Sequence, residues 1–127
     1  MSAFKALRVL VVDDNEDMRA FMKIVLDEAG YETHLAADGR RALDSQREHP
    51  ADVLITDIFM PESDGIELIE HFKSRFPRIK VVAMSGGGQV AKNDYLAVAT
   101  ELGALAVLQK PFDAATLLKT LRDLAER

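Results

Sequence analysis

Five short apolar runs recur along the chain of 127 residues and alternate with longer segments of helical periodicity. The runs cover residues 8–12, 31–35, 53–56, 81–84 and 104–108. The first is continuous and rich in β-branched residues, as is typical of a strand buried on both faces, whereas the second alternates with polar residues and predicts a half-exposed strand. Strands that alternate with helices are joined by right-handed crossovers. We therefore predict an α/β fold with a doubly wound, five-stranded parallel sheet.

Start and stop signals delimit the helices between these strands. Gly30 is expected to end the first helix. Asp64 followed by Glu67 resembles a capping box at the start of the third helix, and Asp113 is the expected cap of the last one. The helical segments are recognised by apolar residues from Met18 to Ala29, at Ala42 and Leu43, from Leu68 to Phe76, from Tyr95 to Leu102 and from Leu117 to Leu124.

Composition narrows the class of protein and of partner. Apolar residues make up 48% and charged residues 29%, which predicts one globular domain over residues 1–127. The chain has no cysteine, so disulfides and thiolate metal sites are excluded. The net charge of −5 disfavours binding to nucleic acid. No secretion signal or membrane span is recognised, so we expect a cytoplasmic monomer or weak dimer whose partners are proteins, small molecules or metal cations.

Polar side chains follow four of the five predicted strands. Asp13 and Asp14 end the first strand, Asp57 the third, Ser85 the fourth and Lys110 the fifth. In doubly wound sheets the functional residues lie at the carboxyl ends of the strands, near the point where strand order reverses. These three carboxylates, one hydroxyl and one ammonium are therefore expected to converge at one edge of the sheet.

Three neighbouring carboxylates repel one another, and a single ammonium does not neutralise them. A divalent cation with oxygen ligands does, and Mg²⁺ suits a partly open site of this kind. A carboxylate also serves as the nucleophile that forms an aspartyl phosphate. In such a reaction the cation, Lys110 and the Ser85 hydroxyl would each hold one phosphoryl oxygen. The alternative is that the two adjacent aspartates only cap the first helix.

Several motifs together resemble the signature of bacterial response-regulator receiver domains. The similarity runs in order over essentially the whole chain, and the set is much more specific than any one piece. The motifs are Val-Val-Asp-Asp-Asn at 11–15, Thr-Asp-Ile-Phe-Met-Pro at 56–61, Asp-Gly at 64–65, Met-Ser-Gly at 84–86, Gly-Ala at 103–104 and Lys-Pro-Phe at 110–112.

The resemblance implies a flavodoxin-like fold with strand order 2-1-3-4-5 and a stand-alone, CheY-like phosphorylation switch of a two-component system. Asp57 would accept the phosphoryl group from a sensor histidine kinase or a histidine phosphotransfer protein. Lys110 and Ser85 would contact that group, and small Gly86 would leave room for it. The Lys110–Pro111 bond is commonly cis in the family. Output would pass to a downstream protein or onward in a phosphorelay, without enzymatic turnover of outside substrates.

The resemblance also implies how Mg²⁺ would be held. Asp14 and Asp57 would be direct ligands, Asp13 would act mainly through water, and the backbone carbonyl of Phe59 would complete the protein ligands.

Three features depart from the family pattern. Val107 stands where an aromatic residue is usual, so output is expected to rely on backbone and loop shifts. The stretch 86–93 is glycine-rich and is expected to be a mobile element. Phe59 is larger than is frequent beside the acceptor and is expected to restrict water and alter the lifetime of the phosphate.

Other functions and residues are less favoured. A flavin-binding protein of the same fold would need a phosphate loop where acidic residues 13–17 stand. A phosphatase would need a lid or specificity insertion, and a degenerate scaffold would not need the complete acidic set. His34, His49 and His71 are expected to be solvated surface groups.

Overall fold

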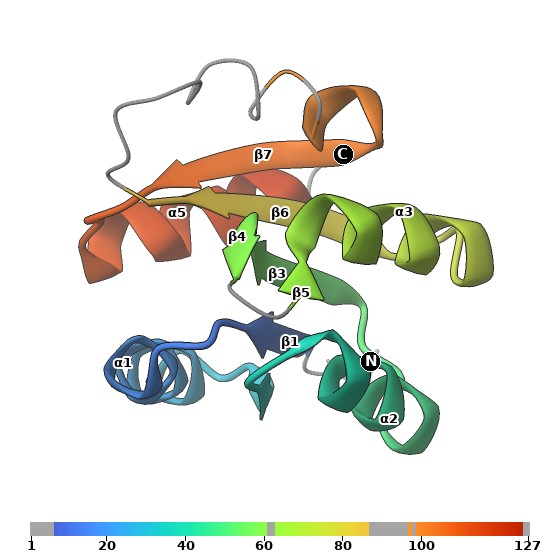
Figure 1. Cartoon of the computed structure of the whole chain (residues 1–127). Helices are drawn as coiled ribbons and strands as arrows, with labels where there is room; N and C mark the ends of the chain where they lie inside the picture. The colour runs from blue at the N-terminus through green and yellow to red at the C-terminus, as the bar shows by residue number, and fades with distance from the viewer. Residues whose placement is uncertain (1–6, 61–62, 87–96, 98, 126–127) are drawn as a thin grey trace.

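The computed structural model describes residues 7–60, 63–86, 97 and 99–125 (Figure 1). Five parallel strands form one sheet in the order β2-β1-β3-β6-β7, which confirms the predicted doubly wound architecture and strand order. The strands are β1 (Arg8–Val12), β2 (Glu32–Ala36), β3 (Val53–Asp57), β6 (Lys80–Ser85) and β7 (Ala104–Gln109).

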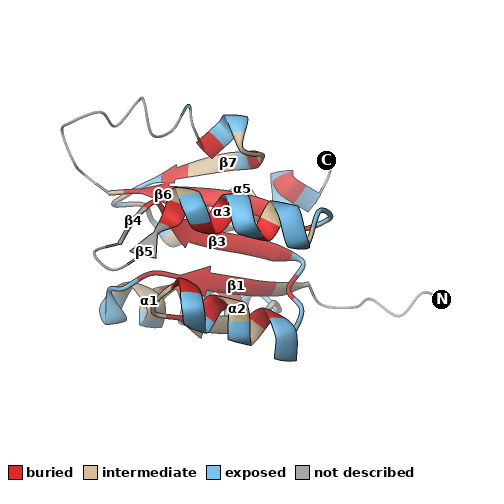
Figure 2. Ribbon diagram, turned by 45° about the vertical axis from the view of Figure 1, so that its right-hand side comes forward, coloured by how far each residue is buried: buried red, intermediate tan, exposed pale blue. Residues whose placement is uncertain are grey.

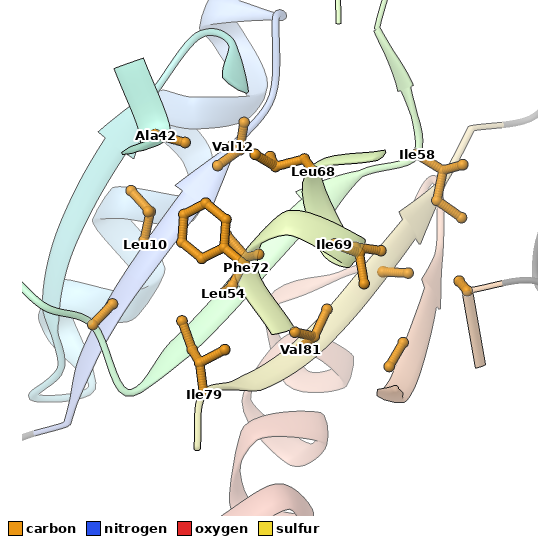
Figure 3. Close-up of a cluster of buried hydrophobic side chains, with 14 of the residues drawn as sticks. Leu10, Val12, Ala42, Leu54, Ile58, Leu68, Ile69, Phe72, Ile79 and Val81 are labelled. Atoms are coloured by element: carbon orange, nitrogen blue, oxygen red, sulfur yellow. The ribbon is translucent and has the colours of Figure 1, made fainter. Parts of the chain in front are cut away.

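Among the described residues, α1 (Glu16–Glu28) and α5 (Ala114–Ala125) cover one face of the sheet, and α2 (Gly39–Glu48) and α3 (Gly65–Arg75) cover the other, where Ala99 is also buried (Figures 1 and 2). On the first face α1 and α5 supply Met22, Leu26, Leu117, Leu121 and Leu124 to a buried cluster. On the other face α2 and α3 contribute Ala42, Leu68, Ile69 and Phe72. Figure 3 shows Phe72 directed at the strands in the middle of this second cluster.

The central strands β1 and β3 are apolar because they are buried on both faces. Leu10 and Val12 of β1 belong to one buried cluster, and Val9 and Val11 belong to the other. All five residues of β3 are buried. A strand covered by helices on both faces has no solvent-facing side, so polar alternation is lost.

Helix ends follow the predicted signals. Gly30 has φ +97°, a left-handed conformation that glycine adopts freely, and it ends α1. The Asp113 carboxylate accepts a hydrogen bond from the backbone N–H of Thr116 at 2.8 Å, as expected of a cap. Asp64 directly precedes α3, and its side chain lies outside the described structure.

The first helix is capped by Asn15, whose side-chain oxygen accepts from the N–H of Met18 at 2.8 Å. Capping therefore does not account for Asp13 and Asp14, which were the other candidates for that role. The two aspartates therefore do not serve as the N-cap of α1.

Two segments complete the comparison with the predicted elements. The short antiparallel pair β4 (Phe59–Met60) and β5 (Ser63–Asp64) was not predicted. Of the helix expected over 95–102, Ala97 and residues 99–101 are helical, while Tyr95, Leu96 and Val98 lie outside the described residues. Within the described ranges no helix combines the length and apolarity that crossing a membrane requires.

Candidate functional site

The three predicted acids meet at the carboxyl edge of the sheet. Asp57 is the last residue of β3, and Asp13 and Asp14 directly follow β1, its neighbour in the sheet. One carboxylate oxygen from each lies within 4.8 Å of the other two. Asp13 is 0% exposed and Asp57 5% exposed, while Asp14 is open to solvent. The cluster thus has a buried floor and one accessible carboxylate.

Lys110 joins this cluster from the end of β7. Its Nζ lies 2.6 Å from Oδ2 of Asp13 and 2.9 Å from Oδ2 of Asp57, so one ammonium donates to both buried acids. Burial alone would lower the pKa of Lys110, but its hydrogen bonds to Asp13 and Asp57 raise that pKa above the ordinary value. The amine is therefore held as a cation against Asp13 and Asp57.

The backbone around Lys110 fixes this position. Its N–H donates to the carbonyl of Ser85 at 2.8 Å, continuing the pairing of β6 with β7, and the Lys110–Pro111 bond is cis as expected. Ser85 is buried at the end of β6, and its hydroxyl donates to the Gly86 carbonyl at 3.3 Å. The serine is thus brought to the same edge, one residue beyond the Asp57–Met84 pair.

A close backbone contact holds the segment at the end of β3 to α3. The N–H of Gly65 donates to the carbonyl of Ile58 at 3.1 Å. A Cβ atom at position 65 would lie 2.1 Å from the Asp57 carbonyl oxygen, so only glycine fits there without displacement. Sequence reasoning identified the Asp-Gly motif at 64–65 but not this contact.

Electrostatics favours a divalent cation beside these acids. Two charges separated by 4.8 Å repel by about 3.5 kcal/mol at an effective dielectric of 20, and by less where solvent screens exposed Asp14. Three carboxylates and the one ammonium leave a formal charge of −2. The donors are all oxygens, and one of them faces solvent, which fits a Mg²⁺ that keeps some of its waters. Phe59 lies in β4, two residues after Asp57, and its role as a ligand stays a prediction.

An apolar groove that sequence reasoning missed borders Lys110. It has a volume of about 450 Å³, and the Phe21 and Phe112 rings lie with centroids 6.4 Å apart beside it. Its signal was present in the sequence, because apolar Met18 and Phe21 on α1 precede the Pro-Phe pair at 111–112 that follows the lysine. Its lining residues are Asn15, Asp17, Met18, Phe21, Lys110, Pro111 and Phe112.

Comparison with known proteins agrees with this geometry. The sequence profile of the response regulator receiver domain matches residues 9–122. The chain belongs to that family. Receiver domains are the signalling modules of two-component systems, so the convergence of Asp13, Asp14, Asp57 and Lys110 has a family context.

Two curated relatives of this receiver domain are small proteins. Sporulation initiation phosphotransferase F of Bacillus subtilis is 35% identical over 106 residues, which cover 84% of this chain and 83% of the relative. Chemotaxis protein CheY of Thermotoga maritima is 33% identical over 120 residues, covering 94% of this chain and 98% of the relative.

Solved structures have the same fold. CheY4 of Vibrio cholerae matches with a TM-score of 0.83 and 32% identity over 94% of this chain and 98% of that one. NtrX of Brucella abortus matches with a TM-score of 0.87 and 30% identity over 94% of this chain, but the chain spans only about a quarter, 26%, of NtrX. Receiver domains of this kind therefore occur both in small proteins and within longer ones.

The remaining predicted features have mixed outcomes. Of the three histidines expected to be solvated surface groups, His49 and His71 are exposed as predicted. His34 is partly exposed, with 25% of its side chain accessible; it contacts Glu32 Oε2 at 2.8 Å and stacks on His49 at 4.4 Å between ring centroids. Val107 is half-buried against the core, and its effect on switching stays a prediction. Of the stretch 86–93 only Gly86 lies within the described residues.

Proposed function

We propose that this receiver domain accepts a phosphoryl group on Asp57 in a Mg²⁺-dependent reaction, with a phosphohistidine of a sensor histidine kinase or histidine phosphotransfer protein as donor. The observation that carries the proposal is the Lys110 ammonium, which contacts both Asp57 and Asp13 at the edge of a three-carboxylate cluster. A purely structural ion pair would need one acid, whereas this arrangement keeps an anionic acceptor beside a cation.

The proposed transfer balances without a further reactant. A carboxylate oxygen of Asp57 forms a bond to phosphorus while the phosphorus–nitrogen bond of the donor breaks, and the imidazole nitrogen leaves with the electron pair. Lys110 neutralises charge on one phosphoryl oxygen, and the Ser85 hydroxyl, at the adjacent strand end, turns from Gly86 to contact another. Asp13, Asp14, Asp57 and the Phe59 carbonyl would hold Mg²⁺, which supplies charge neutralisation to the remaining oxygen.

The apolar groove beside Lys110 is the proposed entry side for the donor. It opens between Phe21 of α1 and Phe112, next to the amine that contacts Asp57. A protein donor must bring its phosphohistidine to within bonding distance of Asp57, and apolar side chains around that point supply binding energy. A small donor such as acetyl phosphate needs no such surface. A change in the groove should therefore slow phosphorylation by a protein donor and leave phosphorylation by acetyl phosphate unchanged.

Output is proposed to pass through altered protein contacts or onward phosphotransfer, with no turnover of outside substrates. The chain aligns with 98% of the length of the Thermotoga chemotaxis protein CheY, and this likeness to a small signalling protein supports output through protein contacts. A differential affinity of a few kcal/mol between the two states is sufficient to shift such a switch.

Intact-mass measurement after incubation with acetyl phosphate and Mg²⁺ tests the proposal. Wild-type protein should gain one phosphoryl group, and the gain should be absent in Asp57→Ala and when EDTA is present. Asp44→Ala, a matched loss of an exposed carboxylate on α2, should be labelled like wild type. Labelling of Asp57→Ala, or no labelling of wild type at any Mg²⁺ concentration, would reject Asp57 as the acceptor.

A further inference from the structure

All four polar atoms of Asp13 are held by other parts of the chain. Its N–H donates to the Ala36 carbonyl at 3.1 Å, at the end of β2. Its carboxylate accepts from the Asn15 N–H at 2.9 Å through Oδ1 and from Lys110 Nζ at 2.6 Å through Oδ2. Its carbonyl oxygen accepts from Nη1 of Arg19 at 2.8 Å. Asp13 is thus a fully constrained residue.

Asp14 has the opposite character. It is exposed, and within the described part of the chain no side chain or backbone group forms a hydrogen bond or ion pair with its carboxylate. Nevertheless its carboxylate lies within 4.8 Å of those of Asp13 and Asp57. Its position must therefore be set through the backbone.

The constraint reaches Asp14 through the peptide bond that joins it to Asp13. Six atoms of a peptide unit are coplanar, including the carbonyl oxygen of one residue and the Cα of the next. Arg19 holds the Asp13 carbonyl oxygen, and the strand pairing holds the Asp13 N–H. Together these bonds restrain the backbone on both sides of Asp13, fix the orientation of the 13–14 peptide plane, and so fix the position of the Asp14 Cα from which its side chain extends.

We infer that Arg19 is a positioning residue that holds Asp14 in place for binding the divalent cation. The inference rests on the proposed Mg²⁺ site and adds a residue that contacts none of the three carboxylates in the structure. Arg19 is half-buried on α1, one turn after the Asn15 cap, so the helix fixes where its guanidinium can reach. Groups of this kind, one step removed from the ligands, typically change metal affinity by about 10- to 100-fold when lost.

The charge of Arg19, taken alone, predicts a change in Mg²⁺ affinity in the opposite direction to positioning. Arg19 is a cation near a cation site, so removing its charge without any change in backbone geometry would tighten Mg²⁺ binding. Positioning predicts weaker binding. The direction of the change in affinity therefore distinguishes the two effects, and no reaction needs to be measured.

Titration calorimetry with Mg²⁺ alone provides the test, using wild type, Arg19→Met, Arg19→Lys and the control Arg122→Met. Arg122 is exposed on α5. Its replacement by methionine removes the same charge as Arg19→Met. Arg19→Met should weaken Mg²⁺ binding about tenfold. Arg19→Lys, which keeps one donor, should recover part of the loss, and Arg122→Met should bind like wild type. Unchanged or tighter binding by Arg19→Met would overturn the inference.

Amide NMR of the metal-free proteins gives a second measurement that does not depend on the cation. The Asp14 N–H belongs to the same peptide unit as the carbonyl that Arg19 holds, so its resonance should shift or broaden in Arg19→Met while far-UV circular dichroism stays unchanged. An unperturbed Asp14 amide would overturn the positioning role. Should wild type bind no Mg²⁺ at all, the cation site itself is rejected, and the NMR result still decides whether Arg19 orients the 13–14 peptide.

Discussion

Replacing Gly65 with alanine is expected to push apart the backbones of α3 and of the segment that carries Asp57. The added Cβ would lie 2.1 Å from the Asp57 carbonyl oxygen, 2.6 Å from the Ile58 Cα and 2.7 Å from the Ile58 carbonyl oxygen. All three are backbone atoms, so no flexible side chain can rotate away. The hydrogen bond from the Gly65 N–H to the Ile58 carbonyl should be lost or lengthened at the same time.

The size of the effect follows from these contacts. A carbon atom and a carbonyl oxygen normally stay at least about 3.3 Å apart, so the two segments must separate by about 1 Å. Overpacking of this kind typically costs about 1–3 kcal/mol, and the gain of about 0.4–1 kcal/mol from a less flexible unfolded chain offsets part of it. The net loss should be roughly 1–2 kcal/mol, or about 3–8 °C in Tm. Misplacing a reacting group by 1 Å can cost about 100-fold in rate, so phosphorylation should slow by more than stability alone explains.

Urea denaturation followed by circular dichroism, together with the rate of labelling by acetyl phosphate, measures both effects. Two other glycines serve as controls. Gly86→Ala should leave stability unchanged, because the added Cβ would have no atom of the described residues within 4 Å apart from its chain neighbours, and φ is not positive there. Gly30→Ala should be destabilised by its φ of +97° but should keep its labelling rate. Equal stability of Gly65→Ala and Gly86→Ala would refute the argument from close contact.

Three further predictions concern the acidic cluster. Mg²⁺ should raise the Tm of wild type and have much less effect on Asp57→Asn. A ligand that binds only the folded state stabilises it by about 2.7 kcal/mol at a concentration of 100 times Kd. Equal shifts in Tm for the two proteins in differential scanning calorimetry would contradict a Mg²⁺ site that includes Asp57. Burial lowers the pKa of Lys110, but its hydrogen bonds to Asp13 and Asp57 raise that pKa above the ordinary value. These two hydrogen bonds therefore contribute their full stability below the pKa of about 10.4 that lysine has in the unfolded chain. That stability is lost as pH rises through the higher pKa of Lys110 in the folded protein. The difference in unfolding free energy between wild type and Lys110→Met should therefore narrow above about pH 10.4, and parallel curves would argue against the ion pairs. Finally, Phe59→Asn should change the decay rate of the phosphorylated protein by altering access of water, and an unchanged rate would remove that role.

The fold was predictable because its strongest signals are local. The run at 53–56 is apolar without alternation, and β3 is buried on both faces. Gly30 and Asp113 mark helix boundaries through backbone conformation and capping, both of which depend on residues a few positions apart. Strand order then followed from the family resemblance, and the pairing of β1 with both β2 and β3 confirms it.

The site was predictable in its residues but not in its contacts. Placement at strand ends identified Asp13, Asp57 and Lys110, because a parallel sheet aligns those ends whatever the intervening sequence. Which carboxylates the amine reaches depends on distances between segments up to 97 residues apart, and no local pattern encodes them. The same holds for the stacking of His34 on His49. The residues of the groove at Phe112 are visible in the sequence, but their meeting across α1 and the end of β7 is not.

Stability and reactivity make opposite demands on this cluster, and the structure divides them between residues. Asp13 is buried and bonded at every polar atom, so it is rigid and its charge is offset by Lys110. Asp14 is exposed, and its carboxylate forms no hydrogen bond or ion pair with the described residues, so it can bind a cation without first breaking one. Asp57 lies between these extremes, because it is buried yet contacts the same amine as Asp13. In the proposed transfer, Asp57 would give up part of its contact with Lys110, and the ammonium would keep Asp13 as a partner while its remaining donors turn to the incoming phosphoryl group.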